Sequence, residues 1–143
     1  MNYWYINTEA KDFGGKSPHK KWFEHGCAFV SGKGYGRKLQ RLQRDDICFM
    51  YANKKGVVAV GCVIEQCDGQ EAQTPLIYCP PEKKGPEYQA KVKWFLWFPK
   101  NPIRPNKLRS ITGSFARQAI QRIADPTAAA SLLSHARQQA GVE

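Results

Sequence analysis

Two apolar runs in the middle of the chain constrain its fold most. Residues 47–52 and 57–64 are rich in β-branched and aromatic side chains, and the short link between them ends in Gly56, as in a tight hairpin. Apolar residues occupy both the odd and the even positions of the second run. Because a strand that is apolar on both faces must be covered on both faces, we expect this hairpin at the centre of the fold.

A glycine-rich basic loop, SGKGYGR at residues 31–37, precedes the hairpin. Its alternate glycines can adopt backbone angles that other residues avoid, and they can present amide N–H groups to a ligand. Leu39 and Leu42 then recur at helical spacing, and Asp45 and Asp46 indicate a turn before the hairpin. We expect this loop at the mouth of the fold, where it can wrap a flat or anionic ligand.

The rest of the chain predicts mainly strands first and helices last. Further strands are predicted over residues 3–7, 27–30 and 88–98, and a short one over residues 76–78 within an irregular segment. In the longest run, the even-numbered residues from Tyr88 to Phe98 are apolar, so we expect them all to face the core. A helix over residues 114–124 should begin at Ser114, and a terminal helix should begin at Asp125.

The charge and the cysteines limit the partners and the environment. A formal net charge of +10 favours a polyanionic partner, although plain solubility also explains a basic chain. The 5 cysteines are odd in number and lie in apolar surroundings, which indicates buried reduced thiols and no disulfide. No apolar run reaches the roughly 20 residues of a membrane helix, and the start of the chain lacks the order of a signal peptide. We expect a single cytoplasmic domain over residues 1–143.

Signatures of metal, cofactor and catalytic sites are weak. The cysteines form no C-x-x-C pair, and the histidines at positions 19, 25 and 135 lack metal-ligand spacing. The glycine-rich segments lack the spacing of a phosphate loop or a dinucleotide loop. We therefore predict no metal, no cofactor and no catalytic residue.

Aromatic residues are abundant and are interleaved with lysine and arginine, a combination typical of base stacking beside phosphate contacts. Taken singly, each aromatic residue is explained more simply as part of the core. Trp97 is the exception, because it interrupts the polar face of its strand beside a basic, proline-rich segment.

The first strand and the central stretch resemble EVE domains. Residues 3–9, YWYINTE, are similar to the opening strand of that family, in which a Tyr-Trp pair precedes a polar stretch with Thr-Glu. Residues 30–51 resemble its loop, helix and strand without a gap, with Asp45 in place of the usual glycine of the turn. Residues 56–63 are similar to its next strand. EVE domains belong with YTH and ASCH domains to the PUA-like folds, so the resemblance implies an α+β fold, a PUA-like bent β-barrel flanked by helices.

The resemblance also implies a function. In YTH domains a flipped modified base sits in an aromatic cage, and EVE-like modules of bacteria are associated with modified DNA bases. We therefore expect a non-catalytic module that binds nucleic acid, DNA in preference to RNA, and takes a modified base into an aromatic pocket. A nuclease encoded elsewhere is a candidate partner.

The site residues follow from the resemblance and from the charge and aromatic patterns. Asn7 and Thr8 match the polar end of the family's first strand. Ser31 and Gly32 match the start of its pocket loop, and Tyr51 the end of the strand beneath it. The predicted base pocket comprises Asn7, Thr8, Trp22, Ser31, Gly32, Lys33, Tyr51, Trp97 and Ser114. The predicted phosphate-binding residues are Lys33, Arg37, Lys38, Arg41, Lys100 and Arg104.

Two other functions fit the same residues. An ASCH-like enzyme acting on a small modified nucleoside would use Lys33 with Glu9 or Thr8 for its chemistry. A protein-interaction module is favoured only if the basic surface binds an acidic protein.

Overall fold

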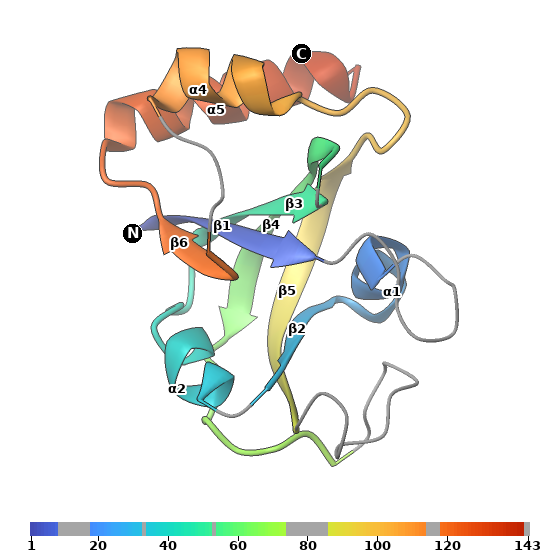
Figure 1. Ribbon diagram of the computed structural model, residues 1–143, viewed down its shortest axis with the longest axis vertical. Helices are drawn as coiled ribbons and strands as arrows, with labels where there is room; N and C mark the ends of the chain where they lie inside the picture. The colour runs from blue at the N-terminus through green and yellow to red at the C-terminus, as the bar shows by residue number, and fades with distance from the viewer. Residues whose placement is uncertain (9–17, 33, 53, 74–85, 114–117, 142–143) are drawn as a thin grey trace.

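The described strands form one six-stranded sheet in the order β2-β5-β4-β3-β1-β6, which curls strongly on itself (Figure 1). The computed structural model describes residues 1–8, 18–32, 34–52, 54–73, 86–113 and 118–141. The strands are β1 (Tyr3–Thr8), β2 (Cys27–Ser31), β3 (Ile47–Ala52), β4 (Gly56–Glu65), β5 (Glu87–Trp97) and β6 (Ile120–Arg122). The described helices are α1 (Pro18–His25), α2 (Tyr35–Leu39), α4 (Pro105–Thr112) and α5 (Pro126–Gln139).

The predicted central hairpin is confirmed, and it lies in the middle of the sheet. β3 and β4 pair antiparallel, with β1 parallel beside β3 and β5 antiparallel beside β4. The turn depends on Gly56, which has a φ of 116° and where a side chain would collide with the carbonyl of Ile103. Both faces of the hairpin are apolar because a different layer covers each face.

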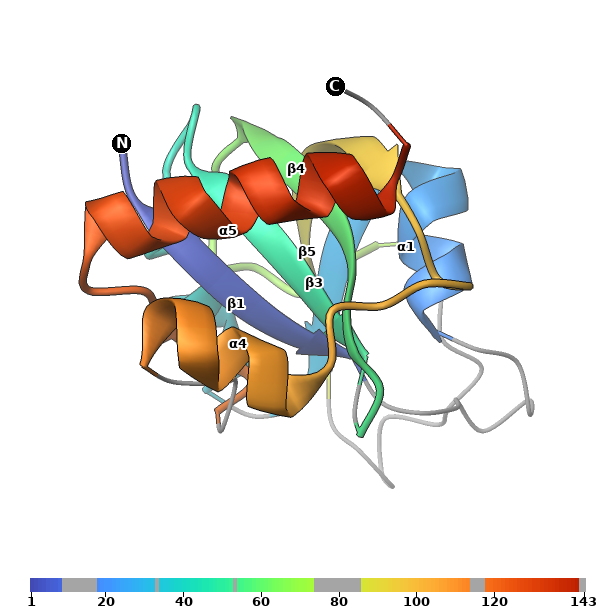
Figure 2. The same ribbon diagram turned by 90° about the horizontal axis from the view of Figure 1, so that it is seen from above.

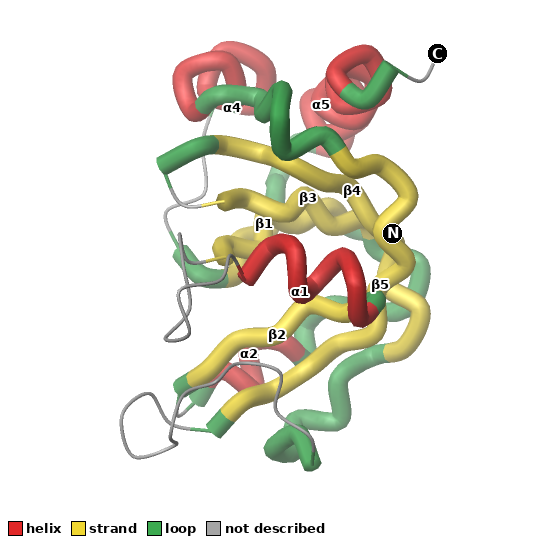
Figure 3. Tube along the Cα trace, turned by 90° about the vertical axis from the view of Figure 1, so that its right-hand side faces the viewer, coloured by secondary structure: helices red, strands yellow, loops and turns green. Residues whose placement is uncertain are grey.

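Two hydrophobic clusters cover the two faces of the sheet. One lies beneath α4 and α5, which cross the sheet in Figure 2, and we call it the helix-covered cluster. Its members include Tyr5, Phe49, Tyr51, Leu96, Leu108 and Leu132. The other fills the curl of the sheet on the side of α1 and α2 (Figure 3), and we call it the barrel cluster. Its members include Trp4, Trp22, Phe29, Met50, Trp94 and, partly buried, Trp97.

The predicted orientation of β5 is wrong at its carboxyl end. Trp94 lies in the barrel cluster, but Leu96 lies in the helix-covered cluster. The pairing between β4 and β5 shifts in register here, which makes Phe95 the extra residue of a β-bulge and leaves it 38% exposed. The bulge also turns Trp97 toward the barrel cluster, which explains why this residue breaks the polar alternation of the strand.

The predicted helix over residues 114–124 is wrong. The helix in this part of the chain comes earlier, since α4 begins at Pro105 and ends at Thr112, followed by Gly113 with a φ of 76°. Farther along, β6 pairs antiparallel with β1 and so covers a sheet edge that would otherwise expose its backbone. This tertiary pairing outweighs the helical spacing of the side chains. Ser114, the predicted N-cap, lies outside the described residues.

The predicted terminal helix is confirmed. The carboxylate of Asp125 accepts a hydrogen bond from the amide of Thr127 at 3.0 Å, and Pro126 occupies the first turn of α5. In the part of the chain that the structure describes, no helix has the length and apolar character needed to cross a membrane. The strand predicted over residues 76–78 lies outside that part.

Candidate nucleic-acid interface

A group of exposed cations follows the carboxyl end of β2. We call Arg37, Lys38, Arg41 and Arg44 the basic edge; they lie on α2 and in the turn after it. Lys38 Nζ lies 5.0 Å from the centre of the Tyr35 ring, and Arg41 Cζ lies 5.1 Å from the centre of a Trp4 ring. Among the described residues, no carboxylate forms a salt bridge with any cation of the basic edge. The edge therefore carries positive charge that the described fold does not neutralise.

A buried carboxylate holds Trp4 beneath Arg41. Asp46 is only 2% exposed. Its carboxylate accepts hydrogen bonds from the indole N–H of Trp4 and the main-chain N–H of Asn2, both at 2.9 Å, and from the main-chain N–H of Gln43 at 3.0 Å. These bonds fix the ring, and the ring in turn limits where the guanidinium of Arg41 can lie. The predicted turn is confirmed, since the amide of Asp46 also donates to the carbonyl of Gln43.

The glycine loop is shaped by packing as well as by its open backbone. Gly34 has a φ of 90° with open space around it, as expected of a loop glycine. A side chain at Gly36, by contrast, would come within 2.6 Å of the Tyr88 ring and 2.9 Å of the Gly69 carbonyl. Gly36 thus lets α2 pack against β5. Ser31 is half-buried and pairs with Glu87 at the start of that strand.

The polar end of the first strand points to the same side of the molecule as the glycine loop. Figure 3 shows the carboxyl ends of β1 and β2 on one side, so Thr8 and Ser31 both lie there. Thr8 is buried, and its hydroxyl donates to the carbonyl of Tyr51 at 3.4 Å. Asn7 is half-buried, and its main-chain N–H donates to the carbonyl of Ala119 at 2.8 Å.

Aromatic rings stack where α1 packs on β2 and β5. Trp22 and Trp94 stack with centroids 6.2 Å apart, and Phe29 meets Trp22 edge-on at 5.5 Å. Phe23 stacks on Trp97 at 4.4 Å and stays 39% exposed. The indole N–H of Trp94 donates to the carbonyl of Cys27, whereas the buried indole N–H of Trp22 has no partner within the described residues.

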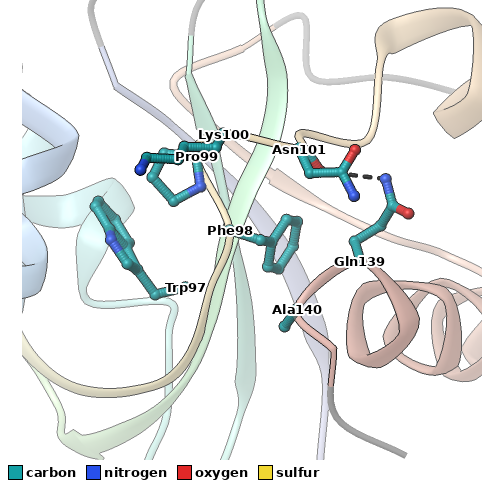
Figure 4. A pocket seen from close by; sticks show the side chains of 7 residues that line it. All are labelled: Trp97, Phe98, Pro99, Lys100, Asn101, Gln139 and Ala140. Atoms are coloured by element: carbon teal, nitrogen blue, oxygen red, sulfur yellow. Dashed lines mark hydrogen bonds between the residues drawn. The ribbon is translucent and has the colours of Figure 1, made fainter.

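A pocket opens at the carboxyl end of β5, next to this aromatic stack. It has a volume of about 230 Å³, and Figure 4 shows the residues around it. The lining residues are Trp97, Phe98, Pro99, Lys100, Asn101, Gln139 and Ala140. The side-chain amide of Gln139 donates to the main-chain carbonyl of Asn101 at 3.1 Å, which joins the end of α5 to the segment after β5.

The structure separates residues that the sequence analysis places in one pocket. Ser31 lies at the start of β5 and Trp97 at its end, and 11 residues at roughly 3.3 Å each put them up to roughly 30 Å apart along the strand. Tyr51 belongs to the helix-covered cluster, where its ring meets Tyr5 edge-on at 6.5 Å. Trp22 lies with Trp97 on the side of α1.

The predicted phosphate-binding residues also fall into separate groups. The basic edge lies at the lower end of the molecule in Figure 1, near α2, whereas Arg104 precedes α4 at the upper end and Lys100 lines the pocket. Lys33, Ser114 and Glu9 lie outside the described residues, so their predicted roles stay predictions.

The sequence analysis missed Phe23, Asn101 and Gln139. A signal for Phe23 exists in the sequence, because adjacent residues on a helix point about 100° apart and Trp22 and Phe23 therefore cannot both face the same core. The amides gave no signal, since only the docking of α5 brings Gln139 to the segment after β5.

The described cysteines are packed into the fold, and Cys79 lies outside the described residues. Cys27, Cys48 and Cys67 are buried free thiols, as predicted, and Cys62 is half-buried. Burial raises the pKa of Cys27 to about 12, with a smaller contribution from the negative charge of Glu87. Within the described ranges, no His, Cys, Asp and Glu side chains gather in threes as a metal site would require.

Comparisons with known proteins identify the class of fold. The sequence matches no protein-family model and no curated protein. The structure is similar to the Pho92 YTH domain in complex with m6A, with a TM-score of 0.67, 14% identity, and coverage of 96% of this chain and 86% of that one. It is also similar to the Toxoplasma CPSF4 YTH domain in complex with a 7-mer m6A-modified RNA, with a TM-score of 0.64, 16% identity, and coverage of 96% and 93%.

A third similar structure is the human THYN1 protein in complex with 5-methylcytosine-containing DNA, with a TM-score of 0.60 and 13% identity. The match covers 95% of this chain and 98% of that one. At these identities the likeness establishes the fold alone. The chain therefore has an α+β PUA-like fold of the EVE and YTH kind, and the resemblance seen in the sequence is confirmed at that level.

Proposed function

We propose that this protein binds nucleic acid and discriminates a modified base, in DNA rather than RNA. The base leaves its stack and enters the fold on the side where β1 and β2 end, near Thr8 and Ser31, while the basic edge holds the neighbouring phosphates. No bond is made or broken.

The basic edge is the observation that carries this proposal. Its exposed cations have no carboxylate partners among the described residues, and the whole chain has a formal net charge of +10. Such a surface gains free energy from a polyanion, because each phosphate contact releases condensed counterions. Arg41 is held over Trp4, so less side-chain freedom is lost when it binds a phosphate.

Discrimination between bases needs a second element. Phosphate contacts carry no information about the base, whereas an enclosed pocket responds to a single methyl group. Extrusion of a base costs a few kcal/mol, which stacking and hydrogen bonds must offset. Structures of the same fold bind m6A and 5-methylcytosine-containing DNA, which supports a pocket of this kind here.

The absence of catalysis is part of the proposal. Of the residues that a catalytic alternative would use, Thr8 is described by the structure. Thr8 is only 2% exposed, and its hydroxyl already donates to the carbonyl of Tyr51. The hydroxyl is therefore poorly placed to transfer a proton to a substrate.

Titration of matched duplexes tests the proposal. DNA with one 5-methylcytosine and the same DNA with cytosine are compared with RNA carrying one m6A or adenine, each at several salt concentrations. We expect the methylated DNA to bind most tightly. For about four to six phosphate contacts, log K should fall against log salt with a slope on the order of −3 to −5.

Two variants separate charge from base discrimination. Arg41→Ala should weaken binding to methylated and unmethylated DNA equally and lower the magnitude of the salt slope by about 1. Lys91→Ala is the matched control, because Lys91 already pairs with Glu65 at 3.3 Å and its loss should leave the slope unchanged. An affinity that does not change with salt concentration would refute the proposal that the protein binds a polyanion. Equal affinity for methylated and unmethylated bases would refute the proposal that it discriminates a modified base.

A further inference from the structure

The pocket at the end of β5 lies outside the site proposed above. Its wall includes Trp97, which the register of the sheet places at the opposite end of β5 from Ser31. A single base bound near Ser31 therefore cannot reach it. If the pocket binds a ligand, that ligand is either a separate molecule or a distant part of the same chain.

The size of the pocket restricts the ligand. Drug-sized ligands occupy pockets of about 300–1,000 Å³, whereas this one has about 230 Å³. It suits one planar ring system with a small substituent. Trp97 offers such a ring an aromatic wall, and Phe23 supports that wall from behind by stacking on it at 4.4 Å.

The other groups at the pocket fit the rest of a nucleotide. Figure 4 shows Trp97 and Gln139 at opposite sides of the pocket, with Asn101 beside Gln139 and Lys100 at the rim. Side-chain amides carry both donors and acceptors, as the edges of bases do. Lys100 is exposed, and among the described residues no carboxylate forms a salt bridge with it.

We propose that this pocket is a second nucleotide subsite. The base of an unpaired nucleotide stacks on Trp97, the amides of Asn101 and Gln139 meet its edge, and Lys100 meets its phosphate. The inference rests on the proposed function for the rest of the strand, which runs from this subsite to the basic edge. At about 3.4 Å per nucleotide of a stacked strand, a separation of up to roughly 30 Å corresponds to about nine nucleotides.

A pair of oligonucleotides tests the subsite in the full-length chain. A single-stranded 3-mer and a 12-mer carry the same central 5-methylcytosine, and only the 12-mer can reach from one site to the other. Ala140→Trp fills the pocket, and Ala130→Trp places the same bulk on an exposed position of α5 outside it. Trp97→Leu removes the aromatic wall, and circular dichroism checks that each variant folds.

We expect Ala140→Trp and Trp97→Leu to weaken binding of the 12-mer about 5-fold to 100-fold, as loss of one stacked base would. Binding of the 3-mer should not change, and Ala130→Trp should match the wild type with both ligands. Unchanged binding of the 12-mer by Ala140→Trp, or an equal loss for both oligonucleotides, overturns the subsite.

A second measurement separates this inference from the proposed function. Adenosine monophosphate is added to the protein, and the side-chain amide resonances of Asn101 and Gln139 are followed by NMR. Shifts that disappear in Ala140→Trp support the subsite even if no oligonucleotide binds, in which case only the proposed function fails. An absence of shifts at millimolar nucleotide overturns the subsite, whatever the oligonucleotides do.

Discussion

The two faces of the sheet are built differently. The helix-covered cluster is closed by α4 and α5 and contains aliphatic residues, tyrosines, Phe49 and Phe98. The hydroxyl of Tyr5 lies 3.0 Å from that of Thr112. The barrel cluster contains tryptophans at positions 4, 22 and 94 and borders both candidate sites. Its indole groups have unequal surroundings, since Trp4 bonds to Asp46 while Trp22 has no described partner.

This difference separates stability from binding. A cluster whose polar groups are satisfied within the fold and whose surface is covered contributes to folding free energy and offers nothing to a ligand. The barrel cluster contributes to folding as well, but its margins carry Arg41 over Trp4 and Trp97 beside the pocket. Apart from Phe98 and Ala140, which line the pocket, substitutions in the helix-covered cluster should therefore change stability alone, and substitutions in the barrel cluster should change both properties.

The largest effect is expected for Leu132→Ala in the helix-covered cluster. Leu132 lies on α5 and is fully buried, so its truncation removes apolar contacts and leaves a cavity that costs about 2–5 kcal/mol. Urea denaturation measures the loss, and titration of the folded fraction should give an unchanged Kd. Ala130→Gly, at an exposed position of the same helix, serves as a control for helix propensity, which costs only about 1 kcal/mol. A change in Kd after correction for folding would break the separation between the two faces.

The next effect compares Trp4→Phe with Trp22→Phe in the barrel cluster. Both changes remove the same atoms, but only Trp4 loses a described hydrogen bond, the one to the buried carboxylate of Asp46. Because a hydrogen bond to a charged group is worth about 1.5–3 kcal/mol, Trp4→Phe should reduce the free energy of unfolding by that much more. Equal losses in denaturation experiments would mean that the N–H of Trp22 has a partner in the folded protein.

Alkaline denaturation tests an ionisable group of the barrel cluster, the thiol of Cys27. Burial raises the pKa of Cys27 from 9.0 to about 12, so the folded protein holds this proton more tightly than the unfolded one. The resulting stability is fully present below pH 9 and is lost as the pH rises toward 12, by about 1.4 kcal/mol per pH unit from this thiol. Cys27→Ala should flatten the fall measured by denaturation over this range. An identical pH dependence in the variant would contradict the assignment to Cys27.

The smallest effect is expected for Tyr5→Phe in the helix-covered cluster. The change removes one hydroxyl, and the hydroxyl of Thr112 still donates to the carbonyl of Leu108 at 3.0 Å, so no polar group is left unsatisfied. The cost should be about 0.5–1.5 kcal/mol, the net value of an ordinary hydrogen bond. Thermal and urea denaturation measure it. A loss as large as that of Leu132→Ala would show that the two hydroxyl groups belong to a larger network.

Sequence patterns predicted the elements whose faces are set by their own residues. The hairpin of β3 and β4 and the N-cap of α5 are of this kind, because apolar alternation and local capping decide them. β6 could not be predicted in this way, since its few residues become a strand only because β1 offers an unpaired edge. The bulge at Phe95 was hidden for a similar reason, because it arises from the register between β4 and β5.

The sequence supplies candidate residues for the site but does not show how they are arranged in space. The run of Lys and Arg near α2 is visible in the sequence, and the structure leaves those side chains exposed. The distance between Ser31 and Trp97 depends on which residues pair across β2 and β5, and no local pattern contains that information. The same holds for Gly36, whose packing against Tyr88 is a contact between distant parts of the chain.

Asp46 gives the parallel pair of β1 and β3 a defined alignment. A slip of one residue would exchange the two faces of β1 and so is excluded by burial, but a slip of two would keep every apolar side chain on its own face. Such a slip would carry Thr8 about 7 Å along the sheet. The carboxylate opposes it, because its bonds to the amide of Asn2 and the indole of Trp4 form in one alignment only. By holding Asn2 and Trp4 at the start of β1, the carboxylate of Asp46 thus sets where β1 ends. It thereby sets the position of the polar residues beside the proposed base site.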